Sequence, residues 1–317
     1  MKVGIILSKG HRLLSVAAIL DVFETANAMT DSQKFEITLL RLKGHEAEGF
    51  EGYQQKDLNG SEQYDLLLLP AFRQDGVPKA LMENKAWIPL LQQQYKNGAA
   101  LGSFCTGAFL LASTGLLDGK AATTHINAEP AFVKAFPNVK VHAEAVVTAQ
   151  DRIYTSGGAT NTFHLLMYLL EIYGSKDLAI RAAKVFSVDL DRSRQDYFGT
   201  FMPEQDHGDD LVKKAQEEIK KNFSKATTIE EIINDVPSSR RNLVRRFKQV
   251  TGLTPIEYLQ KTRIEAAKQL LEKSRYSIAE VMFESGYNDL KTFRSLFKRN
   301  VGMTPKDYRE KFSGQAI

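Results

Sequence analysis

The sequence has one cysteine, Cys105, and one tryptophan, Trp87, among 317 residues. A lone cysteine excludes an internal disulfide and is typical of a protein kept in a reducing cytoplasm. No uninterrupted apolar stretch reaches the length of a membrane span, and residues 1–12 lack the continuous apolar segment of a secretion signal. We therefore expect a cytoplasmic protein that has no membrane stage.

Metal and phosphate motifs are also missing from the sequence. The six histidines are not spaced closely in the manner of a metal site, and no glycine-rich phosphate loop occurs. We expect no metal and no cofactor.

The net charge of +4 is modest, but residues 209–317 carry 22 lysines and arginines against 15 aspartates and glutamates. This excess of +7 in one third of the chain is typical of a nucleic-acid-binding module.

That basic third contains an internal duplication. Residues 246–258 return as residues 296–308, with Phe, Lys, Gly, Thr, Pro and Tyr at the same offset. Chance rarely aligns six positions of such different chemistry. Each copy predicts a short helix, a tight turn and a basic amphipathic helix, which is the helix-turn-helix arrangement. A helical bundle whose charges are merely solvated is the alternative.

The first copy carries its own start and stop signals. Thr228 and Glu231 form a capping box that begins the first helix. Ser239 is expected to cap the second helix, residues 240–250, and Gly252 to end it. The same signals recur in the second copy, where the basic helix is expected over residues 289–300.

Each basic helix is predicted to have an apolar face and a face for DNA. Leu243 and Phe247 point inward from the first helix, and Phe293 and Phe297 from the second. The side chains expected to contact double-stranded DNA are Ser239, Arg240, Arg241, Val244, Arg245, Lys248, Lys291, Thr292, Arg294 and Lys298.

These side chains are expected to divide their tasks. Arg241 and Arg245 contact base edges, because arginine with guanine is the commonest specific pairing, and Val244 contacts a thymine methyl. Thr292 and Arg294 are the expected base-contacting residues of the second helix, and the remaining basic side chains contact phosphates or groove walls.

A long helix is predicted between the two copies. Thr254 caps it, Pro255 occupies its first position, and Glu257 completes a capping box. It should run to about Lys273. At ~1.5 Å per residue, roughly 18 residues span about 27 Å. Because major grooves recur on one face of DNA every ~34 Å, this helix can place two recognition helices in successive grooves.

Residues 209–317 resemble the AraC/XylS-type DNA-binding domain. The signature that carries this resemblance is Ser277-Ile278-Ala279-Glu280, Gly286-Tyr287-Asn288-Asp289, Phe293, Phe297-Lys298-Arg299 and Gly302-Met303-Thr304-Pro305-Lys306-Asp307-Tyr308-Arg309. Ser295 departs from the family, which commonly has a basic residue there, so the second helix is expected to discriminate bases less strictly. The resemblance implies an operator DNA partner, and RNA polymerase as a further partner if the chain is an activator.

The first two thirds of the chain predict alternating strands and helices, and therefore a parallel α/β sheet covered by helices on both faces. The expected strands are 3–7, 35–42, 65–69, 99–102, 139–141, 145–148 and 153–155, and the expected helices are 14–29, 78–97, 106–115, 160–173 and 176–186. We expect a domain at 1–195, an interdomain linker at 196–208 and a second domain, all-α with two helix-turn-helix motifs, at 209–317. A ligand is expected at the carboxyl ends of the strands.

Cys105 is predicted to sit on a sharp strand-to-helix turn. Small residues at Ser103 and Gly107 permit the geometry of a nucleophile elbow, and a helix amino terminus at Cys105 favours a thiolate. His125 follows one strand-helix unit later and is a candidate neighbour. A small buried residue at a tight turn explains the motif equally well.

Residues 103–112, 115–120, 123–125 and 154–171 resemble the PfpI-type branch of the class I glutamine amidotransferase-like fold, including the form found at the amino terminus of GlxA-type regulators. The resemblance implies a flavodoxin-like parallel-sheet sandwich that binds a small-molecule effector and forms a homodimer through this domain. The candidate pocket residues are Cys105, Thr106, His125, Ser15, Phe72, Gly158 and His164.

The same comparison argues against catalysis. Ser15 stands where enzymes of this superfamily place an acidic side chain beside the cysteine, and Ala71-Phe72 replaces a Gly-Gly pair near the oxyanion site. We expect a retained pocket with lost chemistry, and therefore a regulator rather than an enzyme. The alternatives are a cysteine-dependent hydrolase or hydratase, and a redox sensor at Cys105, fused to the DNA-binding domain.

Overall fold

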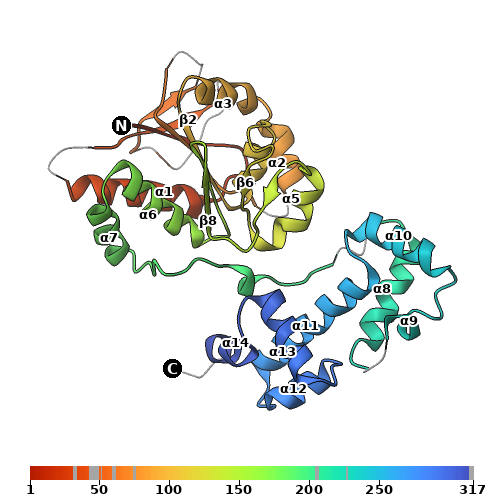
Figure 1. Ribbon diagram of the computed structural model, residues 1–317. Coiled ribbons are helices and arrows are strands. Elements are labelled where there is room, and N and C mark those ends of the chain that lie inside the picture. The colour runs from red at the N-terminus through yellow and green to blue at the C-terminus, as the bar shows by residue number, and fades with distance from the viewer. Residues whose placement is uncertain are drawn as a thin grey trace. The chain divides into compact units, whose positions relative to one another are not determined.

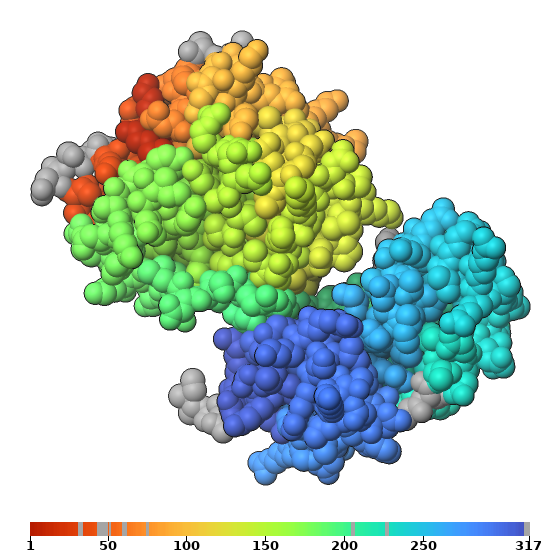
Figure 2. All heavy atoms as spheres, viewed as in Figure 1, coloured from red at the N-terminus to blue at the C-terminus, as the bar shows by residue number. Residues whose placement is uncertain are grey.

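The computed structural model describes residues 1–30, 34–42, 50, 52–58, 62–73, 76–203, 207–225 and 228–313. The chain divides into two compact units, Met1–Gln195 and Asp196–Ile317, which Figures 1 and 2 colour from red to green and from green to blue. In the part of the chain described, no helix is both long enough and apolar enough to cross a membrane.

The N-terminal unit is built on a twisted sheet whose strands run in the order β3-β2-β1-β4-β5-β9-β8. The strands are β1 (Lys2–Ile6), β2 (Glu36–Arg41), β3 (Gln55–Asp57), β4 (Leu66–Leu69), β5 (Ala100–Phe104), β8 (Val147–Gln150) and β9 (Ile153–Ser156). Neighbouring strands pair in parallel except β8 with β9. All four leucines of β4 are buried, as expected for a strand covered on both faces. A short parallel pair, β6 (Ala121–Ala122) with β7 (Lys140–Val141), forms a second sheet.

Helices cover both faces of this sheet, so the unit has three layers (Figure 1). One face packs against α1 (Leu13–Ala28), α6 (Asn161–Tyr173) and α7 (Lys176–Val185). The other packs against α2 (Val77–Asn84), α3 (Trp87–Lys96), α4 (Ala108–Ala112) and α5 (Glu129–Ala135). The predicted flavodoxin-like sandwich is confirmed. The single helix predicted over 78–97 was wrong, because Pro89 cannot continue a helical ladder from the preceding turn and the chain breaks between α2 and α3.

The C-terminal unit is all helical, as predicted. Its helices are α8 (Asp210–Asn222), α9 (Ile229–Ile232), α10 (Arg240–Thr251), α11 (Pro255–Lys273), α12 (Ile278–Glu284), α13 (Leu290–Val301) and α14 (Pro305–Phe312). One core lies under α8 to α10, and a second lies under α12 to α14. Residues of α11 contribute to both cores, so this helix connects the two motifs (Figure 1).

Caps set the ends of these helices. Capping boxes are present at Thr228, Thr254 and Ser277, as the sequence predicts, and a fourth begins α14 at Thr304. The two recognition helices, α10 and α13, end in glycines of left-handed conformation, with φ of 76° and 81°. Equivalent stops in both copies are what a duplication of the same motif requires.

The first part of the predicted linker, 196–208, does not run free of the C-terminal unit. Tyr197 is only 8% exposed and belongs to the core of the second motif. The Phe201 ring lies 5.1 Å from the ring of Tyr258, in the first core. Residues 204–206 lie outside the described part of the chain. The residues that 196–203 packs against lie 57 and 115 positions away in these two contacts. The local pattern of glycines and acidic residues therefore does not predict this packing.

Candidate functional site

Most of the predicted pocket residues belong to segments that meet at the carboxyl end of β5. Cys105 follows this strand directly and has a φ of 53°, a left-handed conformation that is uncommon outside glycine and typical of a nucleophile elbow. Gly107 completes the turn. A Cβ at that position would lie 2.6 Å from the carbonyl oxygens of Leu69 and Pro70, so the loop after β4 can approach only a glycine.

The thiol of Cys105 is sheltered and not activated. The residue is 1% exposed, and burial raises the pKa of its thiol. Hydrogen bonds from the backbone of Thr106 and Ala159 and the positive charge of Arg12 act in the opposite direction but are outweighed. The predicted preference for a thiolate was wrong, because desolvation dominates and the helix that follows, α4, has only five residues. A protonated thiol is a poor nucleophile.

His125 lies near the cysteine loop but is not arranged as a base for it. Thr124 Oγ1 donates to the carbonyl oxygen of Cys105 at 3.0 Å, which fixes the His125 segment beside the elbow. His125 Nδ1 accepts from the Asn127 N–H at 3.1 Å. Burial, and then the charge of Arg12, lowers the pKa of His125. The ring is therefore neutral with its proton on Nε2, and neither nitrogen is free to take a thiol proton.

Side-chain hydroxyls bond to the backbone amides of Ala71 and Phe72, the loop that the sequence comparison relates to an oxyanion site. Ser15 Oγ accepts from the Ala71 N–H at 3.1 Å. Thr106 Oγ1 accepts from the Phe72 N–H at 2.8 Å and donates to the Phe72 carbonyl at 2.7 Å. Both hydroxyl-bearing residues are buried. Ser15 thus anchors the loop after β4 through its hydroxyl oxygen.

The recognition helices present the surface that the duplication predicts. Leu243, Phe247, Phe293 and Phe297 are buried. Of the ten side chains predicted to contact DNA, Val244 is partly exposed and the other nine are exposed: Ser239, Arg240, Arg241, Arg245, Lys248, Lys291, Thr292, Arg294 and Lys298. A helix with a buried aromatic face and an exposed basic face is the form that enters a major groove.

Two of these arginines already have partners on the protein. Arg245 donates to Asn242 Oδ1 at 3.2 Å, which holds its guanidinium along the exposed face of α10. Arg240 forms an ion pair with Glu230 at 2.6 Å, with both side chains largely exposed. By contrast Arg246 pairs with Asp209, the cap of α8, and so serves the fold. The sequence did not indicate the Asn242 contact.

A model of the DJ-1/PfpI family matches residues 1–172, more than half of the chain, and a helix-turn-helix domain model matches residues 234–311. This chain belongs to the DJ-1/PfpI family. Its C-terminal domain is an AraC-type helix-turn-helix domain, so the protein is a DNA-binding transcriptional regulator with a DJ-1/PfpI domain, as the motifs predict.

Two relatives align with nearly the whole chain. The chain is 25% identical to the HTH-type transcriptional regulator GbdR of Pseudomonas aeruginosa, across 97% of this chain and 84% of GbdR. It is 23% identical to the HTH-type transcriptional regulator GlxA of Rhizobium meliloti, across 98% and 96%. A solved protein of Vibrio parahaemolyticus covers 58% of this chain and 98% of its own, with a TM-score of 0.52 and 19% identity, which shows a shared fold.

Within the DJ-1/PfpI domain, not all predicted pocket residues come together. Hydrogen bonds join Thr106 of the elbow to Phe72, and Ser15 to the neighbouring Ala71. Thr124 joins the elbow to the His125 segment, and His125 lies beside Gly158. A Cβ on Gly158 would lie 2.8 Å from His125 Cδ2. His164 has a different environment: its Nε2 lies 2.9 Å from the Asp189 carbonyl oxygen, and its pKa is lowered by burial and then by Arg192.

Gln195, which no motif in the sequence marks, joins the loops of this site. It is 1% exposed, and its Oε1 accepts from the Gly158 N–H at 2.8 Å. Its Nε2 donates to the Thr124 carbonyl at 2.9 Å and to the Ala143 carbonyl at 2.7 Å. One amide therefore fixes both the His125 segment and the loop before α6.

Arg12 is a second residue that sequence reasoning missed. It occupies the N-cap position of α1, and its backbone N–H donates to the Ala71 carbonyl at 2.7 Å. Its positive charge acts to lower the pKa of both Cys105 and His125. A single arginine at a helix start has no recognisable pattern, so only the fold reveals this position.

Proposed function

We propose that this regulator binds operator DNA with α10 and α13 in successive major grooves of one duplex. The observation that carries the proposal is the pair of helices with buried aromatic and exposed basic faces, joined by one helix of 19 residues. At ~1.5 Å per residue that helix is about 28 Å long. The length suits a groove repeat of ~34 Å, once the width of the flanking motifs is added.

Within this proposal, α10 supplies most of the sequence discrimination. Arg241 and Arg245 donate to base edges, and Val244 contacts a thymine methyl. Thr292 and Arg294 are the base-contacting residues of α13, whose exposed Ser295 carries no charge. The remaining lysines contact phosphates, and so does Arg240 when its ion pair with Glu230 breaks.

Arg245→Ala tests this division. The variant should lose about 1–3 kcal/mol of binding free energy on a selected operator and much less on random duplex. Its specificity should relax at one base pair. Lys214→Ala, which removes an exposed charge from α8, is the matched control. Equal losses on operator and random DNA would remove the base-reading role of Arg245.

We infer that the DJ-1/PfpI domain binds a small-molecule effector beside Cys105 and His125 without turning it over. The buried neutral thiol, the neutral histidine and the occupied amides of Ala71 and Phe72 all support a pocket that lacks catalytic chemistry. Dimerisation through this domain, and contact with RNA polymerase if the chain is an activator, belong to the same proposal.

The chain itself offers a route from the effector site to the DNA-binding unit. Gln195 is bonded to the Thr124 and Gly158 loops, and the next residue, Asp196, begins the C-terminal unit. A ligand that displaces those loops would move the point where the two units are joined. It can change DNA binding only by its difference in affinity for the two arrangements.

Cys105→Ser separates this proposal from its rivals. The elbow conformation of Cys105 is the observation that favours an enzyme. A non-catalytic pocket predicts that effector-dependent regulation survives the substitution. Loss of a measurable turnover would instead indicate a cysteine enzyme. Loss of a peroxide response in DNA binding would indicate a redox sensor.

A further inference from the structure

The segment that joins the two units is built into the DNA-binding unit at three points. We call residues 196–203 the strap. At its start, a side chain at Gly302 would collide with the Asp196 carboxylate, so the strap lies against the turn that ends α13. Tyr197 is buried in the second core, with its ring 6.3 Å from that of Phe312 and under Lys311 Nζ at 4.9 Å.

The other end of the strap belongs to the first motif. The Phe201 ring meets the Tyr258 ring at 5.1 Å, and Tyr258 in turn packs against Phe247 of α10 at 5.2 Å. The Phe201 N–H donates to Glu265 Oε2 at 3.1 Å. Within five residues, therefore, the strap passes from the core under α13 to the core under α10.

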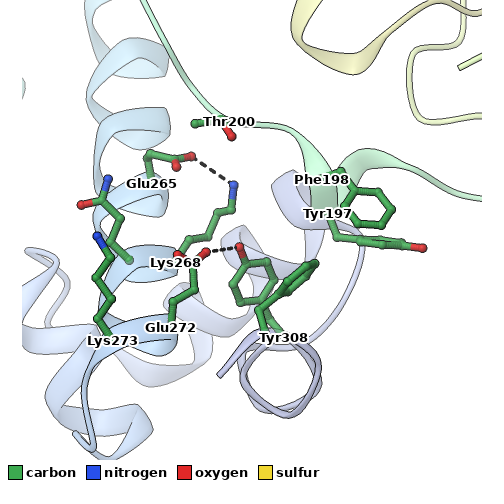
Figure 3. Close-up of a pocket in the computed structure, with 10 residues that line it drawn as sticks. Tyr197, Phe198, Thr200, Glu265, Lys268, Glu272, Lys273 and Tyr308 are labelled. Carbon is green, nitrogen blue, oxygen red and sulfur yellow. Dashed lines mark hydrogen bonds and ion pairs between the residues drawn. The ribbon is translucent and has the colours of Figure 1, made fainter. Parts of the chain in front are cut away.

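A buried lysine fastens the middle of the strap to α11. Lys268 is 5% exposed, donates to the Gly199 carbonyl oxygen and pairs with Glu265 at 3.1 Å. Figure 3 shows this lysine pointing from α11 toward the strap, with Tyr197 and Tyr308 lining the same pocket. Burying an ammonium group is costly unless its partners are well placed, so this arrangement depends on the strap. Because Lys268 is buried, it is not a phosphate contact.

We propose that the strap braces the two helix-turn-helix motifs so that α10 and α13 engage one duplex together. The inference rests on the proposed two-groove binding. The helix α11 is shared by both cores, and a second connection along it limits how far the motifs can bend or turn about that helix. Linked binding modules gain affinity only when their geometry permits simultaneous contact. Tyr197, Phe201 and Lys268 are then positioning residues for DNA binding.

The test compares a complete site with a half-site, using the full-length chain. The complete site is a duplex selected by the unmodified protein from a random library, and the half-site is that duplex with the α13 segment scrambled. Lys268→Met and Phe201→Ala should weaken binding to the complete site by about tenfold and to the half-site by less than about twofold. Met202→Ala, at a strap side chain that is 80% exposed, is the control and should change neither.

Tyr197→Ala and Tyr197→Phe form a second pair. The ring is what packs, so phenylalanine should restore complete-site binding that alanine loses. Should Tyr197→Ala unfold the second core, as seen by lost helical circular dichroism, the Lys268→Met result decides. Equal losses on complete site and half-site, or no loss on either, would overturn the strap inference alone. An unmodified chain that selects no duplex would overturn the proposed function and this inference with it.

Discussion

Replacing Gln195 with alanine removes the amide that joins the loops of the candidate effector site. Its Oε1 accepts from the Gly158 N–H and from Asn161 Nδ2, both at 2.8 Å. Its Nε2 donates most closely to the carbonyl oxygens of Ala143 and Thr124. A glutamine amide has two donors and two acceptor positions, so these four bonds use it fully.

The size of the effect follows from the groups left behind. The truncation leaves two N–H donors, from Gly158 and Asn161, and two carbonyl oxygens without this partner at a position where Gln195 is only 1% exposed. Each such group costs about 1–3 kcal/mol, and such costs are not fully additive. We therefore expect a loss of roughly 3–5 kcal/mol in the unfolding free energy of the N-terminal unit. Ser193→Ala, at an exposed neighbour, should change it by less than about 0.5 kcal/mol.

The sequence provides its own probe for this measurement. Trp87 is the only tryptophan and is fully buried in the N-terminal unit. Its fluorescence in a urea titration therefore follows that unit alone, which matters because a chain of two units need not unfold in one step. A shift of less than about 1 kcal/mol for Gln195→Ala would refute the view that this amide holds the pocket loops together.

Three further predictions can be tested by DNA binding or by the Trp87 urea titration. Lys298→Ala should weaken binding to all duplexes alike and reduce the salt slope by about one; a loss confined to one sequence would contradict its phosphate role. Burial lowers the pKa of His125 and of His164, so below about pH 6.5 the unfolded chain takes up protons first. Their contribution to stability should fall as the pH drops through the folded-state pKa. If the Trp87 urea midpoint falls with pH to the same extent after both histidines are replaced with asparagine, this prediction is contradicted. Gly107→Ala should destabilise the same unit by more than about 2 kcal/mol, because its Cβ meets two backbone carbonyls; an unchanged midpoint would show that the elbow can relax.

The C-terminal motifs could be predicted closely because their signals are local. Thr254 and Glu257 lie three residues apart, and the structure has their capping box where the sequence places it. Leu243 and Phe247 are buried one helical turn apart, as their spacing requires. Duplication supplied an internal check, since each copy made the other's pattern recognisable.

The candidate effector site was only partly predictable, because its decisive contacts join distant parts of the chain. Gln195 bonds to Thr124, 71 positions away, and no periodicity or cap marks such a pair. The packing of the strap could not be predicted for the same reason, since Lys268 donates to Gly199, which lies 69 positions away. The protonation of the Cys105 thiol could not be predicted from the sequence either, because the extent of its burial decides the direction of the pKa shift.

The proposed binding mode requires α10 and α13 to dock together on one duplex. A hydroxyl-radical footprint of the full-length chain on its selected site tests this directly. Two-groove docking predicts, for each bound chain, two protected segments on one face of the DNA, separated by one helical turn of ~34 Å. A single protected groove, or no preference for any duplex over competitor DNA at moderate salt, would contradict it.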